Sequence, residues 1–598
     1  MFRPNSILLA GAVLALLAVL GGAALLKGGL FIGMHEGDTI HLMEIVLRMA
    51  GGEWPQFDFT TPIGPLAFAP IVLFSSAGLG IGMSILWGQV LTAAVLAPAV
   101  WWVAATRMER GPAFLFAVYV MILILALIHG EDHASVSISM HYNRWAWALA
   151  YLAIAAAVLP PMDKGTGTVD GLIVGLAMAA LALMKVTYFA AFAIPVALGL
   201  ILTGQRRAIV VALIAGIAVA GLVTVLAGPG YWLAYMADLR EVAASTTRPQ
   251  PGLPLREVIT GPLYLGASLT ALAAVVFLRQ AGAETGGLML LLLLPGFFYV
   301  TFQNFGNDPQ WLILLAVLLL ALKPAAGGEG RNGFGLTHKV ALGGAAAVAL
   351  AFAAPSFFNL AWSPFRHYSV DAQMFVPVLP RGGVNADLFS RQGRALRTDI
   401  TVPVDAPALG LPAFREEEQR EHTVVFLGET RAYCELSNGM IAVFDAVARD
   451  LEEAGYGGRR VFTADLFNPY WMYGDLAPLP GGAPWNYGDL AGFEAAEFLM
   501  VPTCPTLPRV QAPILSALEA RGTEDLTEVR RTALYTLYRV GEEELSPSAG
   551  PQAEVTPDAL PDAALETGDA DEEEDAIDPE AARAIDALID RAIEEPAR

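Results

Sequence analysis

The sequence predicts a polytopic α-helical membrane protein with a small soluble α/β domain and a disordered acidic tail after its last span. Three observations lead to this fold class. The chain of 598 residues is 55% hydrophobic and only 16% charged, with a mean hydropathy of +0.52, whereas soluble domains contain about 25% charged residues. Long apolar runs fill residues 1–355. The net charge of −22 belongs almost entirely to the remainder, and a chain without a basic face is not expected to bind nucleic acid.

Eleven apolar runs within residues 1–355 have the composition of membrane spans, although several are shorter than the roughly 20 residues that a span requires. The first run is long and further runs follow it, so we interpret it as a span and not as a cleaved signal peptide. The sequence therefore predicts about eleven spans. The runs cover residues 6–26, 82–106, 112–129, 145–160, 169–184, 187–203, 208–227, 262–278, 286–302, 309–322 and 339–355.

One further apolar run, residues 65–78, is too short to cross. As a helix it would rise about 21 Å, against a hydrocarbon core of about 30 Å, so we expect a re-entrant or interfacial segment. Ten Lys and Arg residues then fall on one set of loops and six on the longer opposite loops. The positive-inside rule places the first set, with the N-terminus, in the cytoplasm. In a bacterial cell the chain would be a multi-pass inner-membrane protein, and everything after residue 355 would be periplasmic.

Residues 356–544 are predicted to form the α/β domain, with an irregular, Pro-rich lead-in. We expect a buried strand at 422–429, a helix at about 438–455 and a strand at 532–540, and this alternation is typical of an α/β domain. Two more strands are expected within RRVFTADLF and AEFLMVPTC. Residues 545–598 are rich in Pro, Ala and acidic residues and are predicted to be mostly disordered.

Two features of this exported part leave alternatives open. The aromatic stretch 468–489 could stack on carbohydrate, or it could pack on its own domain or on the membrane. Cys434 and Cys504 are the two cysteines of the chain. Export would allow a disulfide, but their spacing does not decide whether they pair.

The first loop, which follows the first span and is predicted to face outward, contains a helix-compatible stretch with acidic residues. Residues 35–68 read HEGDTIHLMEIVLRMAGGEWPQFDFTTPIGPLAF. Asp38 lies at or just before the first turn of the stretch, where the helix dipole favours a carboxylate. His41 lies three residues later, on the same helix face. Asp58 belongs to an Asp-Phe pair that leads into the short apolar segment.

The second loop, residues 129–145, reads HGEDHASVSISMHYNRW and is predicted to lie on the same side of the membrane. It contains Glu131, Asp132 and Arg144. Two acidic clusters are therefore expected to converge on one face of the membrane domain. A charged residue at such an edge can also simply be solvated or paired.

The order of these elements resembles the first loop of the GT-C superfamily of integral-membrane glycosyltransferases. The order is a first span, an acidic residue that opens an interfacial helix, Gly-x-Trp-Pro, an Asp-Phe pair and Pro-x-Gly-Pro before a short apolar segment. Members include the protein O-mannosyltransferases and the aminoarabinose transferases that act on lipid A. The resemblance covers the order of elements over residues 1–355, and its specific part is residues 35–68. The second loop departs from the pattern because it reads Gly-Glu-Asp-His.

The resemblance implies an inverting transfer of a sugar from a polyprenyl phosphate or diphosphate to an envelope glycan, lipid or protein acceptor. Asp38 would be the general base that removes the acceptor proton. His41 would orient Asp38 or share the proton, although a His at this interface can also be simple packing.

Several residues are candidates for binding the donor phosphate or the substrate. Lys185 and Arg144, at predicted span ends, could supply the positive charge that stabilises the departing phosphate, or either side chain could snorkel. Asp58 is a further candidate. Gln303 and Asn304 could hydrogen-bond sugar hydroxyls, or they could belong to a tight turn.

A metal site is an open alternative. Glu131 and Asp132 could bind a divalent cation, Mg²⁺ or Mn²⁺, because such hard cations prefer several oxygen ligands. Adjacent residues cannot all reach one ion from regular structure, so ligands from the first loop would also be needed. No cofactor is otherwise expected.

Two other classes of function remain. A secondary transporter or flippase of a lipid-linked glycan would show charged residues deep within spans and repeat-like halves, and the sequence shows few such charges. A non-catalytic membrane scaffold would leave Asp38 far from the acidic pair of the second loop. No nucleotide-binding glycine motif is present in a convincing context, which disfavours transport driven by ATP.

Overall fold

The computed structural model describes residues 4–541 except 130–133, 164, 248–251, 304–307, 324–329, 405–407, 409 and 411–422. Residues 1–546 form one compact unit, which contains both the apolar helices and the strands that follow them. The tail that the sequence predicts to be disordered, residues 545–598, lies outside the described residues.

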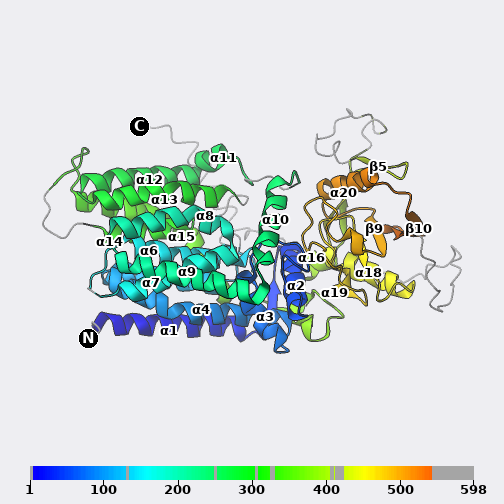
Figure 1. Cartoon of the computed structure of the whole chain (residues 1–598), viewed down its shortest axis with the longest axis horizontal. Coiled ribbons are helices and arrows are strands. Elements are labelled where there is room, and N and C mark those ends of the chain that lie inside the picture. The colour runs from blue at the N-terminus through cyan, green and yellow to red at the C-terminus, as the bar shows by residue number, and fades with distance from the viewer. Residues whose placement is uncertain are drawn as a thin grey trace, which may run out of the picture. The chain divides into compact units, whose positions relative to one another are not determined.

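Each of the eleven apolar runs lies on a helix, and these helices run alongside one another (Figure 1). Seven of the described helices are long and apolar enough to cross a membrane, and three more are apolar but shorter. The chain is therefore a polytopic α-helical membrane protein, and eleven crossings remain a prediction. The helices are α1 (Pro4–Leu25), α4 (Ile81–Arg107), α5 (Arg110–Leu125), α6 (His141–Val158), α7 (Gly167–Met184), α8 (Val186–Leu202), α9 (Arg206–Ala227), α12 (Pro262–Gln280), α13 (Glu284–Phe302), α14 (Trp311–Ala321) and α15 (His338–Ser369).

Short helices lie in the connections between the long ones. The segment 65–78 forms a 3₁₀ turn, η1 (Pro65–Ala67), and then α3 (Ala69–Ser76). The eight residues of α3 rise about 12 Å and cannot cross a membrane. Two other connecting helices, α2 (Glu36–Ala50) and α10 (Gly230–Ala244), run crosswise to the long helices in Figure 1. A six-residue helix, α11 (Leu255–Thr260), precedes α12.

A small sheet joins the start of the chain to the region that follows α15. Strand β1 (Leu30–Ile32) pairs in parallel with β3 (Leu388–Arg391), and β3 pairs antiparallel with β2 (Phe375–Pro377). Strands can pair only within one compartment. The first loop and the region after α15 therefore share one side of the membrane, as the loop charges predict.

The C-terminal region, residues 370–541, contains a four-stranded mixed sheet in the order β10-β11-β9-β8. Its central strand β9 (Phe498–Pro502) is fully buried, as its apolar sequence requires, and it pairs in parallel with β8 (Val461–Thr463) and antiparallel with β11 (Tyr535–Val540). Helices α18 (Met440–Glu453) and α20 (Pro508–Arg521) pack with these strands through apolar faces. Minor elements are η2 (Ala372–Met374), η3 (Gly383–Asp387), α16 (Gln392–Ala395), α19 (Tyr470–Tyr473), η4 (Phe493–Ala495) and the pair β4 (Asp399–Thr401) with β7 (Glu435–Asn438).

A strand forms within 422–429 as predicted, but the prediction that it is buried is wrong for all but Phe426. Within that range, Val424–Phe426 forms β5, which pairs only with β6 (Glu429–Arg431) as a short hairpin, and Val425 is exposed. The fourth strand of the main sheet is instead β10 (Leu526–Arg531), whose alternation of polar and charged residues gives no sign of a strand in a core. Pairing with β11 supplies its backbone partners, so β10 needs no apolar face.

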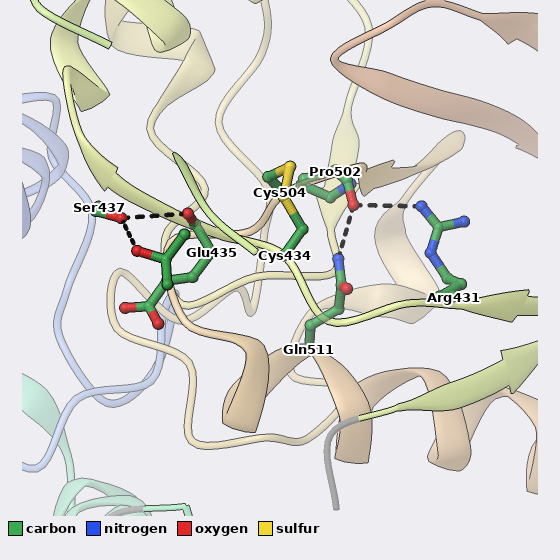
Figure 2. The surroundings of a disulfide bond; sticks show 8 residues. Arg431, Cys434, Glu435, Ser437, Pro502, Cys504 and Gln511 are labelled. Atoms are coloured by element: carbon green, nitrogen blue, oxygen red, sulfur yellow. Dashed lines mark hydrogen bonds between the residues drawn. A yellow bond between two sulfur atoms is a disulfide. The ribbon is translucent and has the colours of Figure 1, made fainter. Parts of the chain in front are cut away.

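Cys434 and Cys504 form a disulfide across 70 residues, with their Cα atoms 4.7 Å apart. Figure 2 shows that the bond lies beside Pro502, whose carbonyl oxygen accepts hydrogen bonds from Gln511 at 2.9 Å and from Arg431 at 3.3 Å. The disulfide thus ties the segment before β7 to the end of β9. The alternative that the sequence left open is decided in favour of pairing.

Candidate functional site

Helix α2 presents Asp38 in its first turn, as the sequence predicts. The helix begins after His35, whose backbone is left-handed with φ of 63°. The Nδ1 atom of His35 lies 2.9 Å from the Ser137 hydroxyl of the second loop. This contact turns the chain into α2 and places the first carboxylates of the helix beside the second loop.

The first and second loops therefore converge at Asp38. The Ser139 hydroxyl donates to the Asp38 carboxylate at 2.7 Å, and the amide of Gly33 donates to the carbonyl oxygen of Val136 at 2.8 Å. Asp38 itself is half-buried. The predicted acidic pair of the second loop, Glu131 and Asp132, lies outside the described residues.

Asp38 and His41 line a cavity of about 160 Å³. Four segments that are distant in the sequence form its wall. The first loop contributes Asp38, His41 and Ile63; the start of α6 contributes Met140 and Tyr142; Thr247 follows α10; and the C-terminal region contributes Leu466, Trp485, Asn486, Tyr487, Leu507, Arg509 and Val510.

The C-terminal region is held against the first loop by backbone hydrogen bonds. Thr60 donates its amide to the carbonyl oxygen of Gly482 at 3.1 Å, and Gly481 donates to that of Asp58 at 2.7 Å. Arg48 on α2 donates to the carbonyl oxygen of Leu479 at 2.8 Å. These contacts hold residues 466–510, which form part of the cavity wall, against the first loop.

Lys185 lies at the break between α7 and α8, next to this cavity. Its Nζ is 5.2 Å from the ring centroid of Tyr142, which lines the cavity. The first loop contacts the end of α7 just before Lys185, because the amide of Gly64 donates to the carbonyl oxygen of Met184 at 3.2 Å. A Cβ atom at Gly64 would lie 2.1 Å from the carbonyl oxygen of Leu183, so only glycine permits this approach.

An apolar groove of about 510 Å³ lies between α7, α8 and α9. It reaches the end of α7, because Ala182 and Leu183 line it and Lys185 follows directly. Other lining residues include Met178, Phe189, Val196, Leu213 and Trp232. The outer surface of α9 is largely exposed and apolar, as expected for a helix in contact with lipid.

The other predicted substrate residues lie in different settings. Arg144 is fully buried on α6 and donates to the carbonyl oxygens of Ala126, at 2.7 Å, and Ile128, so its guanidinium holds the end of α5. Asp58 is exposed and accepts the amide hydrogen of Trp54 at 2.6 Å, which closes a turn. Their substrate-binding roles remain predictions.

Gln303 is buried at the end of α13, and its side-chain nitrogen has no hydrogen-bond partner among the described residues. Asn304 lies outside the described residues. Within the residues that the structure describes, no group of three or more His, Cys, Asp and Glu side chains could hold a metal ion. A cation at Glu131 and Asp132 therefore remains a prediction.

Three carboxyl groups on the connecting helices α2 and α10 have a raised pKa. Burial raises the pKa of Glu44 on α2 to about 7, although Arg48 opposes the shift. Burial also raises the pKa of Asp238 on α10 to about 7. The pKa of Glu241 is raised to about 8, first by burial and then by its hydrogen bond and charge interaction with Asp489.

Sequence reasoning missed the contribution of the C-terminal region to the cavity. The aromatic stretch 468–489 was a partial signal, since Trp485 does line the cavity. Other aromatic residues of the stretch, such as Tyr470 and Tyr473, are instead buried in the core. Arg509 follows an unremarkable Thr-Leu-Pro sequence, and nothing in its surroundings indicates a site.

Together these features define a polytopic membrane protein with a polar cavity at Asp38 and an apolar groove between α7, α8 and α9. No protein-family model and no curated protein matches the chain. Its fold is similar to the crystal structure of ArnT from Cupriavidus metallidurans bound to undecaprenyl phosphate, with a TM-score of 0.40 and 12% sequence identity, over 91% of this chain and 99% of that chain.

Proposed function

We propose that this protein is an inverting glycosyltransferase that moves a sugar from a polyprenyl phosphate or diphosphate to an envelope acceptor at the outer face of the membrane. One observation carries the proposal. The carboxylate of Asp38 lines a polar cavity whose Tyr142 wall is next to Lys185, at the end of an apolar groove. A lipid-linked donor needs these three features together: a groove for the chain, a cation for the phosphate and a base for the acceptor.

The groove and Lys185 would bind the donor. An isoprenoid chain gains free energy when its apolar surface leaves water or fills a matching groove, and the lining between α7, α8 and α9 is almost wholly apolar. Its headgroup would then lie at the end of α7. The ammonium of Lys185 would stabilise the negative charge that develops on the departing phosphate.

Asp38 would act as the general base. The acceptor oxygen forms a bond to the anomeric carbon while the bond from that carbon to the phosphate oxygen breaks. The electron pair leaves with the polyprenyl phosphate, and the acceptor proton passes to the Asp38 carboxylate. Attack opposite the leaving group inverts the anomeric centre. Ser139 holds the carboxylate by a hydrogen bond, and His41 lies in the same cavity wall.

An Asp38→Asn variant tests this proposal, because the amide keeps the shape of the side chain and cannot accept the proton. We expect loss of a surface glycan, measured by mass analysis of the cell envelope, at an unchanged protein level. Asp399→Asn is the matched control, since Asp399 lies on β4 beside the exposed Arg397. Full glycan synthesis in the Asp38 variant would contradict the proposed mechanism.

The same preparation separates transfer from transport. Purified protein in liposomes with a polyprenyl-linked sugar should form a glycosidic product when an acceptor is added. Movement of the sugar lipid across the bilayer without any product would favour a flippase and would count against the transferase.

A further inference from the structure

Arg509 of the C-terminal region lines the same cavity as Asp38 and His41. It is half-buried near the start of α20. Among the described residues its guanidinium has no ion pair, and its buried Nε has no hydrogen-bond partner. The cation therefore borders the cavity with no carboxylate of the described residues to neutralise it.

Several other arginines of the C-terminal region are ion-paired. Arg539 shares with Arg509 a buried Nε that has no partner among the described residues, but it does not line the cavity. The guanidinium groups of Arg381, Arg394, Arg449, Arg459, Arg521 and Arg530 each lie within 3.2 Å of a carboxylate. Arg509 alone among these residues borders the cavity.

The backbone that carries Arg509 is fixed in advance. The buried carboxylate of Asp465 accepts hydrogen bonds from the amide of Thr506 at 2.8 Å, from its hydroxyl at 2.7 Å and from the amide of Leu507 at 3.2 Å. Helix α20 starts at the next residue. Arg509 is therefore presented by an ordered turn, and its backbone would not have to be ordered when it binds a ligand.

We propose that the C-terminal region forms the acceptor subsite and that Arg509 binds an anionic group of the acceptor, a carboxylate or a phosphate. A guanidinium matches the geometry of both groups with two parallel hydrogen bonds. The proposal rests on the proposed function, because the anion would lie near the hydroxyl that Asp38 deprotonates.

Two observations assign the anion to the acceptor and not to the donor phosphate. The donor phosphate is tethered to a lipid chain, and the apolar groove ends at α7 beside Lys185. Arg509 instead belongs to the C-terminal region and shares the cavity with Trp485. Trp485 is half-buried, and its ring centroid lies 5.4 Å from that of His41 and 5.2 Å from that of Phe467, with the ring planes steeply inclined. An aromatic side chain of this kind suits the apolar face of a sugar ring.

Binding of four probes to the full-length chain in lipid nanodiscs tests the proposal. Glucose, glucose 1-phosphate and glucuronate differ in charge, and undecaprenyl phosphate represents the donor lipid. Tryptophan fluorescence and competition report the affinities. We expect the two anionic sugars to bind at least tenfold more tightly than glucose, and Arg509→Gln to abolish that preference. Arg509→Lys should retain part of it, because it keeps the charge but not the paired hydrogen bonds.

The control variants separate the two anion sites. Lys185→Gln should weaken the binding of undecaprenyl phosphate and leave the affinity for the anionic sugars unchanged. Arg449→Gln should change neither affinity. The proposal is overturned if the wild-type protein binds glucose as tightly as the anionic sugars. It is also overturned if Arg509→Gln weakens the binding of undecaprenyl phosphate as much as Lys185→Gln does. Arg509 would then belong to the donor site.

The thermal midpoint of each variant shows whether it is folded. If Arg509→Gln does not fold, the affinities of Arg509→Lys test the proposal instead. Failure of the proposed function gives a different result. In that case Asp38→Asn would keep full activity whatever Arg509→Gln does to anion binding.

Discussion

The hydroxyl of Ser139 donates a 2.7 Å hydrogen bond to the carboxylate of Asp38, across 101 residues of sequence. This bond joins the second loop to the first turn of α2. The hydroxyl is buried, because Ser139 is only 2% exposed, so water cannot easily replace it.

Replacing Ser139 with alanine should therefore impair catalysis without unfolding the protein. A hydrogen bond to a charged group contributes about 1.5–3 kcal/mol, and its loss would let the Asp38 carboxylate rotate. We expect kcat to fall about tenfold or more while the affinity for undecaprenyl phosphate is unchanged. Ser516→Ala is the control, since Ser516 only donates to the carbonyl oxygen of Ala512 within α20. An unchanged kcat would mean that Ser139 does not position the base.

Gly64→Ala should disrupt the corner between the first loop and α7. The added Cβ would lie 2.1 Å from the carbonyl oxygen of Leu183, and backbone atoms on both sides leave no flexible side chain to move. We expect a lower thermal midpoint and loss of undecaprenyl phosphate binding. Gly11→Ala should be harmless, because a Cβ at Gly11 meets no atom within 4 Å. Equal behaviour of the two variants would show that the first loop does not contact α7 so closely.

The disulfide should contribute substantially to the stability of the C-terminal region. Closing a loop of 70 residues removes enough chain entropy from the unfolded state to stabilise the fold by about 4 kcal/mol. A protein with both Cys434→Ser and Cys504→Ser should unfold at a clearly lower temperature. Wild-type protein should react with a maleimide only after reduction, because the described part of the chain contains no free cysteine. Labelling without reductant would disprove the bond.

Stability should fall as the pH rises from about 5 to 8. The pKa of Asp238 is raised to about 7 and that of Glu241 to about 8, so the folded protein holds protons that the unfolded chain has already released. The stabilisation is complete at low pH and is lost as the pH rises through the folded pKa values. The thermal midpoint of the full-length protein, or hydrogen exchange along α10, would measure it.

Glu241→Gln is the matched test of this pH dependence, because an amide keeps the hydrogen bond to Asp489 and does not ionise. The variant should lose most of the slope between pH 5 and pH 8 and should be more stable than wild type at pH 8. Glu257→Gln, which also replaces a Glu after α9, should keep the wild-type slope. A Glu241 variant with an unchanged slope would assign the effect to other groups.

Features that depend on local composition could be predicted from the order of residues alone. Apolar runs cannot remain in water, so eleven of them predicted eleven helices, and the shortness of 65–78 predicted a segment that does not cross. Asp38 was predicted to lie in the first turn of a helix because the helix dipole and the spacing of apolar residues both act within a few residues. The loop charges placed the first loop and the C-terminal region on one side, and the pairing of β1 with β3 agrees.

Contacts between distant segments could not be predicted in this way, because they depend on how the whole chain packs. The apolar residues of β5 predicted a buried strand, yet β5 pairs with β6 in a short hairpin. The polar residues of β10 gave no sign of a strand, yet β10 joins the main sheet by pairing with β11. The cavity combines Asp38 with Trp485 and Arg509, residues more than 400 positions apart. A lone arginine in a polar stretch looks like any surface residue. Its environment becomes distinctive only when folding brings it to the cavity that Asp38 also lines.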